Sequence, residues 1–155
     1  MSIMNTCSFC IELLHCVAKD ADADFSGVGF ICYSDLSGLP HLALNVPPCS
    51  VRALPVVGVI ATGAFLAEAS RGSSPLHDGF HFIAAQGFAL THVCQFIAPV
   101  IPSDLSNVQF AAGARHMSAQ LASRAQGIEA TALMAKDGNG VVYKDGIKIF
   151  EERLR

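Results

Sequence analysis

The sequence is short of charge and has no long uninterrupted apolar run. Charged residues make up 15% of its 155 residues and hydrophobic residues 52%, a balance that excludes an intrinsically disordered chain. Lys and Arg do not gather in any one stretch, so we expect no nucleic-acid partner. The longest apolar candidate, residues 51–69, is interrupted by Arg52, Pro55 and Glu68, so we expect no membrane span.

The amino terminus has no basic stretch ahead of an apolar one, so the sequence predicts no signal peptide. We therefore expect a cytoplasmic protein whose six cysteines stay reduced. Cys7 and Cys10, in "CSFC", have the spacing of a metal or redox pair, but a structural zinc site needs four ligands and no second pair follows. Packing within an apolar helix is the preferred interpretation, and metal or redox chemistry is the alternative.

Hydrophobic periodicity predicts helices alternating with strands. Helical spacing extends over residues 6–19, with Thr6 as the expected cap, and again over 61–70 and 111–126. Strands are expected in pairs, with turns between them. The expected strand regions are a hairpin of 27–35 with 40–46, a second hairpin within 78–100, and three short strands within 129–154.

This order of elements predicts an α/β (α+β) fold built on a mixed sheet, in one domain that spans residues 1–155. In the stretch "FHFIAA", Phe80 and Phe82 fall on one face of the expected strand, and His81 and Ile83 fall on the other. Both sets look buried, which is typical of a central strand.

Two polar clusters interrupt this apolar sequence. The first, "SPLHDGFHF", places His77, Asp78 and Gly79 where a loop enters a strand. A carboxylate there could hold a divalent metal or accept a hydroxyl proton, with His77 as a second metal ligand. For this cluster taken alone, and likewise for the second one described next, a capping aspartate or a histidine with an ordinary hydrogen-bond partner is the preferred interpretation, and a ligand site is the alternative.

The second cluster, "GARHMSAQ", places Gly113, Arg115 and His116 at the start of a predicted helix. The first turn of a helix has unpaired N–H groups and partial positive charge, and both favour anions. An arginine beside it adds a forked donor for phosphate. If the two clusters share one cavity, the sequence predicts a site for a nucleotide or a related phosphorylated ligand.

The stretches "SPLHDG", "GARH" and "KDGNG" occur in that order, with a predicted hairpin between the first two. Together they resemble the diadenylate cyclase (DAC) domain, whose motifs run roughly "PLHDGA", "GTRHRAA" and "SEETG". The resemblance covers residues 66 to about 149. It implies a largely antiparallel mixed sheet flanked by helices, and a reaction that joins two ATP molecules, one on each of two facing protomers, into cyclic di-AMP.

By this resemblance, Asp78 would serve a metal such as Mg²⁺ or Mn²⁺ and the attacking hydroxyl, and Gly79 would allow close approach. Arg115 and His116, with Gly113 ahead of them, would hold phosphates. His77 beside Asp78 would favour Mn²⁺ over Mg²⁺. Asp137 would stand near the position of the acidic metal partner in "SEETG".

Three departures from the family pattern concern the site. Phe80 replaces the small residue after "DG", and a ring there would fill nucleotide space unless it turns into the core. Met117 replaces the second arginine of "RHR", which removes one phosphate contact. Lys136 stands where an acid is expected, or the acid is displaced to Asp137. Since phosphoryl transfer depends on charge placement, these losses should damage catalysis more than binding.

Three hypotheses follow. The first is a divergent DAC-like domain that binds a nucleotide such as ATP as a sensor or regulatory module, with little or no cyclase activity. The second is an active diadenylate cyclase. The third is an interaction or structural protein that keeps only the fold, for which the apolar composition and the helix bearing Met117 would suit a homo-oligomer interface.

Overall fold

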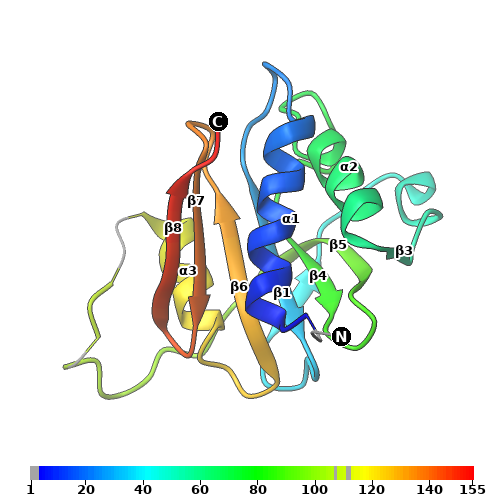
Figure 1. The fold of residues 1–155 in the computed structure, drawn as a ribbon. Coiled ribbons are helices and arrows are strands. Elements are labelled where there is room, and N and C mark those ends of the chain that lie inside the picture. Colours follow the sequence, from blue (N-terminus) through cyan, green and yellow to red (C-terminus); the bar gives the residue numbers. More distant parts are fainter. Residues whose placement is uncertain (1–3, 107, 111–112) are drawn as a thin grey trace.

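The computed structural model describes residues 4–106, 108–110 and 113–155, and within these ranges it contains three α-helices and an eight-stranded sheet (Figure 1). The α-helices are α1 (Thr6–Asp20), α2 (Val59–Ala69) and α3 (Ala114–Ala122), and η1 (Pro48–Val51) is a short 3-10 helix. The strands are β1 (Val28–Tyr33), β2 (His41–Ala43), β3 (Val56–Val57), β4 (Phe80–Ala84), β5 (Ala89–Ile97), β6 (Ile128–Met134), β7 (Asn139–Lys144) and β8 (Ile147–Arg153). The predicted class, a mixed and largely antiparallel sheet flanked by helices, is confirmed.

Strand β1 lies in the middle of the sheet. The strand order is β2-β5-β4-β1-β6-β7-β8, and β3 lies beside part of β5. β1 and β4 run parallel, whereas the other pairings are antiparallel. Five of the six residues of β1 are buried without alternation, as expected for a strand covered on both faces.

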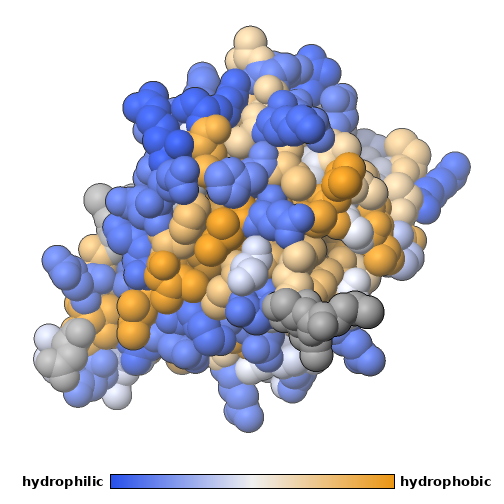
Figure 2. Space-filling model, in the orientation of Figure 1, coloured by the Kyte–Doolittle hydropathy of each residue, from blue (hydrophilic) through white to orange (hydrophobic). Residues whose placement is uncertain are grey.

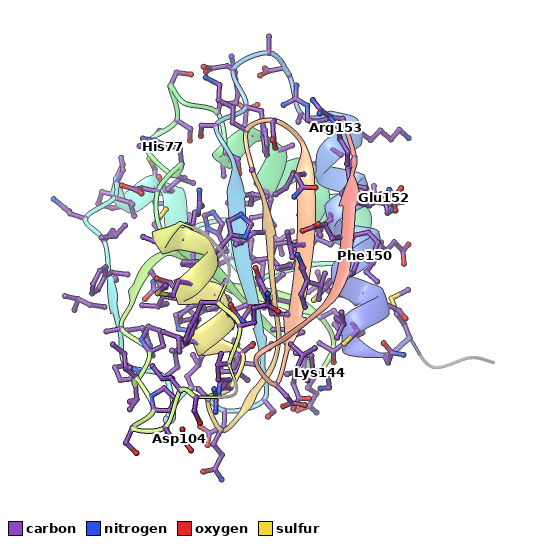
Figure 3. The ribbon with its side chains drawn as sticks, turned by 90° about the vertical axis from the view of Figure 1, so that its left-hand side faces the viewer. His77, Asp104, Lys144, Phe150, Glu152 and Arg153 are labelled. Atoms are coloured by element: carbon purple, nitrogen blue, oxygen red, sulfur yellow. The ribbon has the colours of Figure 1, made fainter. Side chains whose placement is uncertain are left out.

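Helices cover both faces of the sheet. α1 and α2 pack on one face, where Leu13, Leu66 and Ile83 belong to one hydrophobic core. α3 packs on the other face, where Ala119 and Phe82 belong to a second core. Figure 3 shows the sheet between α3 on one side and α1 on the other. The opposite-face assignment of Phe82 and Ile83 predicted from their alternation is therefore confirmed.

The predicted hairpin of 27–35 with 40–46 is wrong. β1 pairs with β4 and β6, whereas β2 pairs with the end of β5. The burial of the two strands explains the difference, because β1 is buried on both faces and every residue of β2 is exposed. A strand with two apolar faces needs the centre of the sheet, and an exposed three-residue strand suits an edge.

The later strand predictions are confirmed. β4 and β5 form the second hairpin, and β6, β7 and β8 are the three strands expected within 129–154. Asp137 and Gly138 lie in the turn between β6 and β7, and Asp145 and Gly146 form the turn between β7 and β8. The turn residues thus predicted correctly which strands, consecutive in the sequence, pair with each other.

The helices lie where they were predicted, but their ends differ; α2, for example, spans Val59–Ala69 instead of 61–70. Asn5, not Thr6, caps α1, because its side chain accepts a hydrogen bond from the backbone N–H of Ser8 at 2.8 Å. α3 ends at Ala122 instead of residue 126, since residues 123–125 close through shorter-range backbone bonds such as that from Arg124 N–H to the Leu121 carbonyl. The predicted start at 111–112 lies outside the described residues.

Strand β8 forms one edge of the sheet. Its apolar residues Ile147 and Ile149 are exposed, and Figure 2 shows apolar surface among charged surface over this side of the molecule. The pairing of β7 with β8 shifts register between Val142 and Tyr143, so the edge is irregular. Charges and irregularity of this kind discourage pairing with another strand. In the part of the chain that the structure describes, no helix has the length and apolar character needed to cross a membrane.

Candidate phosphate-binding edge and a second pocket

The sheet topology brings the two polar clusters to one end of the sheet. β1 and β4 are parallel and begin at this end, whereas the antiparallel β6 finishes there. Asp78 and Gly79 therefore lie immediately before β4, Gly27 lies before β1, and Lys136 lies just after β6. The amino terminus of α3 meets the same end through Arg115.

Arg115 joins the second cluster to the first. Its Nη2 donates a hydrogen bond to the carbonyl oxygen of Gly79 at 3.2 Å. Burial lowers the pKa of the Arg115 guanidinium, and the negative charge of Asp78 acts in the opposite direction. Asp78 and Arg115 thus interact electrostatically, and a hydrogen bond holds Arg115 to the loop that carries Asp78.

Gly79 makes a close backbone contact at this point. Its φ is +77°, and a Cβ added there would lie 2.9 Å from the carbonyl oxygen of Gln95 and 3.0 Å from Leu44 Cδ1. A side chain at this position would be strained and crowded. The group that approaches Gly79 closely in the structure is therefore the backbone of β5.

Phe80 turns into the core. Its side chain is buried in the core beneath α3, and the guanidinium of Arg115 lies 5.8 Å from its ring centre. A Cβ added at Gly29 would lie 2.7 Å from the ring, so the absence of a side chain on β1 makes room for it. The ring therefore fills space in the core and packs against the guanidinium of Arg115.

His77, labelled in Figure 3, and Asp78 next to it in the sequence lie on the exposed loop ahead of β4. His77 Nδ1 is 2.6 Å from the Ser74 carbonyl oxygen, an arrangement in which the ring donates and Nε2 stays available. Asp78 Oδ1 accepts a hydrogen bond from the Gly79 N–H at 3.1 Å. Both side chains retain an atom that a ligand could reach.

His81 differs from His77 in its burial. It is 1% exposed, and its Nδ1 accepts a hydrogen bond from the Cys94 N–H at 3.3 Å. Burial, with a smaller effect from Arg115, lowers the pKa of His81 to about 4. His81 is therefore a neutral core residue.

His116 contacts strand β7. Its Nδ1 lies 3.2 Å from the hydroxyl oxygen of Tyr143 on β7. Burial lowers the pKa of His116, and the carboxylate of Glu151 opposes the shift. His116 thus connects the start of α3 to β7, while its neighbour Arg115 reaches the Asp78 loop.

Gly113 and Asp137 border the same end of the sheet and remain accessible. Gly113 precedes α3 with a φ of +95°, and a Cβ added there would meet nothing within 4 Å. Asp137 is exposed, and its Oδ1 accepts a hydrogen bond from the Asn139 N–H at 3.0 Å. Asp137 lies close enough to His116 to influence its charge.

A pocket of about 300 Å³ opens beside Asp78. Its walls come from the segment after β2, the loop ahead of β4, and β5. The residues that line it are Leu44, Asn45, Val46, Pro75, His77, Asp78 and Cys94. Arg115, Gly113, His116 and Asp137 do not line this pocket, so the acidic loop forms part of its wall and the basic cluster does not.

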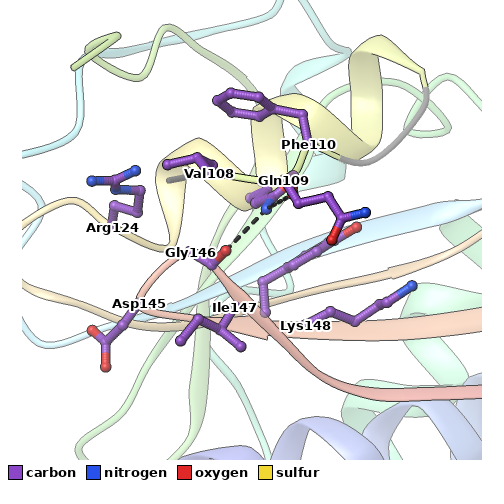
Figure 4. A pocket seen from close by; sticks show the side chains of 10 residues that line it. Val108, Gln109, Phe110, Arg124, Asp145, Gly146, Ile147 and Lys148 are labelled. Atoms are coloured by element: carbon purple, nitrogen blue, oxygen red, sulfur yellow. Dashed lines mark hydrogen bonds between the residues drawn. The ribbon is translucent and has the colours of Figure 1, made fainter. Parts of the chain in front are cut away.

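A larger pocket, of about 690 Å³, lies elsewhere, between α3, residues 108–110 and the β7–β8 turn (Figure 4). None of the sequence-predicted site residues lines it. His77 and Asp78 line the smaller pocket and not this one, so we place the candidate site at the smaller pocket. No single stretch of sequence indicated the larger one, because three separate segments build it.

The two cysteines of "CSFC" have different surroundings. Cys10 is buried with its Sγ 3.5 Å from that of Cys32, whereas Cys7 is half-buried. Within residues 4–106, 108–110 and 113–155, no group of three or more His, Cys, Asp or Glu side chains is placed to hold a metal ion. A metal at Asp78 would therefore share its coordination with a ligand, as Mg²⁺ does when nucleotide phosphates complete its shell.

The sequence matches no protein-family model and no curated protein. The structure is similar to that of a hypothetical membrane-spanning protein from Bacillus cereus, with a TM-score of 0.58 and 17% identity over 95% of this chain. This chain spans only 63% of the length of that protein.

The structure is also similar to that of DacA from Staphylococcus aureus, a diadenylate cyclase solved as an N166C/T172C double mutant. The TM-score is 0.51 and the identity 16%, over 92% of this chain and 85% of that one. At such low identity the similarity shows a distant DAC-like fold. It leaves ligand and activity to be argued from this chain's own residues.

Proposed function

We propose that the edge of the sheet at Asp78 binds a nucleotide or a related phosphorylated small molecule, and that the protein acts as a sensor or regulatory module with little or no cyclase activity. The observation that carries this proposal is the hydrogen bond from Arg115 to the Gly79 carbonyl. It sets the cation of one motif against the acidic loop of the other, beside a pocket lined by His77 and Asp78.

The pocket would contact one part of a nucleotide, and the adjoining sheet end at Arg115, which lies outside the pocket lining, would contact another. Leu44 and Val46 supply apolar contact for a base, and about 300 Å³ is at the lower end of the volumes typical of small-molecule sites. Asp78 would bind a ribose hydroxyl, or a Mg²⁺ or Mn²⁺ ion shared with phosphates, with His77 beside it. The N–H groups of Arg115 that Gly79 does not use, and the open start of α3 at Gly113, would attract the phosphates.

The same residues argue against efficient catalysis. Met117 is 40% exposed on the first turns of α3, where a second cation would reach phosphate, and it carries no charge. Lys136 follows β6 where an acid is expected. Loss of one donor to a transition state typically lowers a rate by about 10²–10³. Binding needs fewer of these contacts and survives the changes.

A thermal-shift panel of ATP, ADP, AMP and cyclic di-AMP, each with and without Mg²⁺ or Mn²⁺, tests binding. A ligand at 100 times its Kd stabilises the fold by about 2.7 kcal/mol, which raises the melting temperature by about 5–10 °C for a chain of this size. We expect Asp78→Asn to abolish the shift. The control Asp35→Asn changes an exposed aspartate beyond the opposite end of β1 and should keep the shift.

The variant Met117→Arg tests the same proposal by an expected gain in affinity. It adds a cation at the start of α3 and should tighten phosphate binding about tenfold. No shift with any nucleotide, or equal shifts for wild type and Asp78→Asn, would contradict the proposal. Cyclic di-AMP formed from ATP by the wild-type protein would contradict its regulatory part, and the mass of the complex in solution would then show whether two protomers meet.

A further inference from the structure

The buried side-chain amide of Gln120 connects the segments that surround the larger pocket. Gln120 on α3 uses its Nε2 to donate hydrogen bonds to the carbonyl oxygens of Gln109 and Gly146, both at 2.9 Å. Ser123 Oγ accepts a further bond from the Gly146 N–H at 2.9 Å. These bonds join α3 to residues 108–110 on one side and to the β7–β8 turn on the other. The hollow between them is therefore a fixed feature of the packing.

The walls of this pocket combine apolar and polar surface. Val108, Phe110 and Ile147 contribute apolar side chains, and Ile147 is 64% exposed at the rim. Tyr143 lies deeper, 2% exposed, and its hydroxyl contacts His116. A volume of about 690 Å³ is well within the range of small-molecule sites, which are mostly apolar with a few polar groups that fix orientation.

Charge is distributed unevenly around the pocket. Arg124 and Lys148 lie on opposite sides of Gly146 (Figure 4). Lys148 already pairs with Glu151 at 2.8 Å. Arg124 is exposed and lies against Gly146, and among the described residues its guanidinium has no hydrogen-bond or ion-pair partner. The unpaired cation of this pocket is therefore Arg124, with the carboxylate of Asp145 also at the lining.

We infer that this pocket binds a small organic anion, whose carboxylate or phosphate is held by the Arg124 guanidinium and whose apolar body packs against Val108, Phe110 and Ile147. Arg124 can form two parallel hydrogen bonds to either kind of anion. Asp78, Gly79 and Arg115 do not line the pocket, so this site is separate from the proposed nucleotide site. Its ligand would contact α3 at the end opposite the one that carries Arg115.

Two probes of matched shape test the role of charge. 3-Phenylpropionate carries a carboxylate, and 3-phenylpropionamide has the same body without the charge. We expect the carboxylate to bind at least about tenfold more tightly, because hydrogen bonds between charged groups are the stronger ones. Calorimetry gives the affinities, and amide chemical shifts show whether residues 143–148 respond. Phenyl phosphate, titrated in parallel, shows which of the two anions is preferred.

Three variants sharpen the test. Arg124→Gln should remove the preference for the carboxylate, whereas Asp145→Asn should increase the affinity, since it removes a neighbouring negative charge. Arg52→Gln removes an exposed arginine beside η1, outside the pocket, and should change nothing. Equal binding of the two probes, binding unaffected by Arg124→Gln, or no binding of either anion at millimolar concentration would overturn the inference. Asp78→Asn should leave this binding intact, which separates the result from that of the nucleotide panel.

Discussion

The two ends of helix α3 each carry an arginine, and the two arginines have opposite surroundings. Arg115, in the first turn, is half-buried over the Phe80 ring and donates to the Gly79 carbonyl. Arg124, just beyond the last turn, is exposed, and within the described part of the chain its guanidinium has no partner. The first is part of the packing of the sheet end, and the second is left for a ligand.

Membership of a sequence motif and the availability of hydrogen-bond donors for a ligand are therefore different properties of an arginine. Arg115 belongs to the stretch "GARH", whose resemblance to the DAC motif predicts a phosphate contact, yet the fold already uses one of its donors and part of its surface. Arg124 belongs to no motif, and none of the described residues accepts a hydrogen bond from its guanidinium. A single helix thus supports one site in which the cation also stabilises the structure and one in which it does not. The stability of variants at the two ends should show this difference directly.

The largest expected effect is at Phe80, beneath Arg115. Phe80→Ala removes a buried ring and should lower the free energy of unfolding by about 3–5 kcal/mol. Gly29→Ala introduces a Cβ 2.7 Å from that ring and should itself be destabilising by about 1–3 kcal/mol. Urea unfolding of both variants and of the double variant measures the three values.

In the Phe80→Ala background, Gly29→Ala should be much less harmful, because the clashing ring is gone. The double-mutant cycle then gives a coupling energy between the two positions. Strictly additive losses would mean that Gly29 does not make room for Phe80, and that the packed end of α3 is looser than the structure shows.

The next effect concerns His81, which feels the charge of Arg115 from within the core. Its pKa falls from 6.5 to about 4 on folding. Between these two pH values the unfolded chain therefore binds a proton at His81 and the folded chain does not. Its contribution to stability is complete above pH 6.5 and is lost as the pH falls toward 4, by about 3 kcal/mol in total.

His81→Gln keeps an acceptor for the Cys94 N–H and removes the titration. Wild type and variant, unfolded in urea at a series of pH values, should differ in their pH dependence over this window. The difference between them isolates His81 from carboxylates such as Asp24 and Asp35, whose pKa values the fold also lowers. If the free energy of unfolding depended on pH in the same way in both proteins, His81 would have to reach water in the folded protein.

The smallest effect compares the two arginines themselves. Arg115→Gln should lower the free energy of unfolding by about 1–3 kcal/mol, since a charged hydrogen bond to a carbonyl is lost over a buried ring. Arg124→Gln should change it by less than about 0.5 kcal/mol, as is usual for exposed side chains. Thermal unfolding without ligand measures both, and equal losses would remove the distinction between the two ends of α3.

Local patterns in the sequence predicted much of the fold. The hairpin of β4 and β5 and the strands β6 to β8 were predicted because each pair is separated by a turn sequence. The first hairpin was predicted wrongly by the same logic, since "LSGL" looks like a turn between β1 and β2. Burial decides the pairing instead, and the burial of β1 depends on strands that lie far along the chain.

The candidate site was predictable in part. Asp78 precedes β4, the start of α3 reaches the same end of the sheet through Arg115, and the motif order indicated that the two belong together. The exact use of Arg115 could not be predicted, because it depends on the direction in which the Gly79 carbonyl points. The pocket beside Arg124 escaped prediction, since its walls come from separate segments that Gln120 joins through hydrogen bonds.

The central place of β1 has a consequence for synthesis. One side of β1 is completed only when β4 has been translated, and the other only when Met134 has been added. A nascent chain on the ribosome therefore holds an apolar strand with an open edge through most of its elongation. Such long-range pairing slows folding and leaves the strand exposed to wrong partners, so chaperone contact with residues 28–33 is expected to matter more for this protein than for one built of successive hairpins.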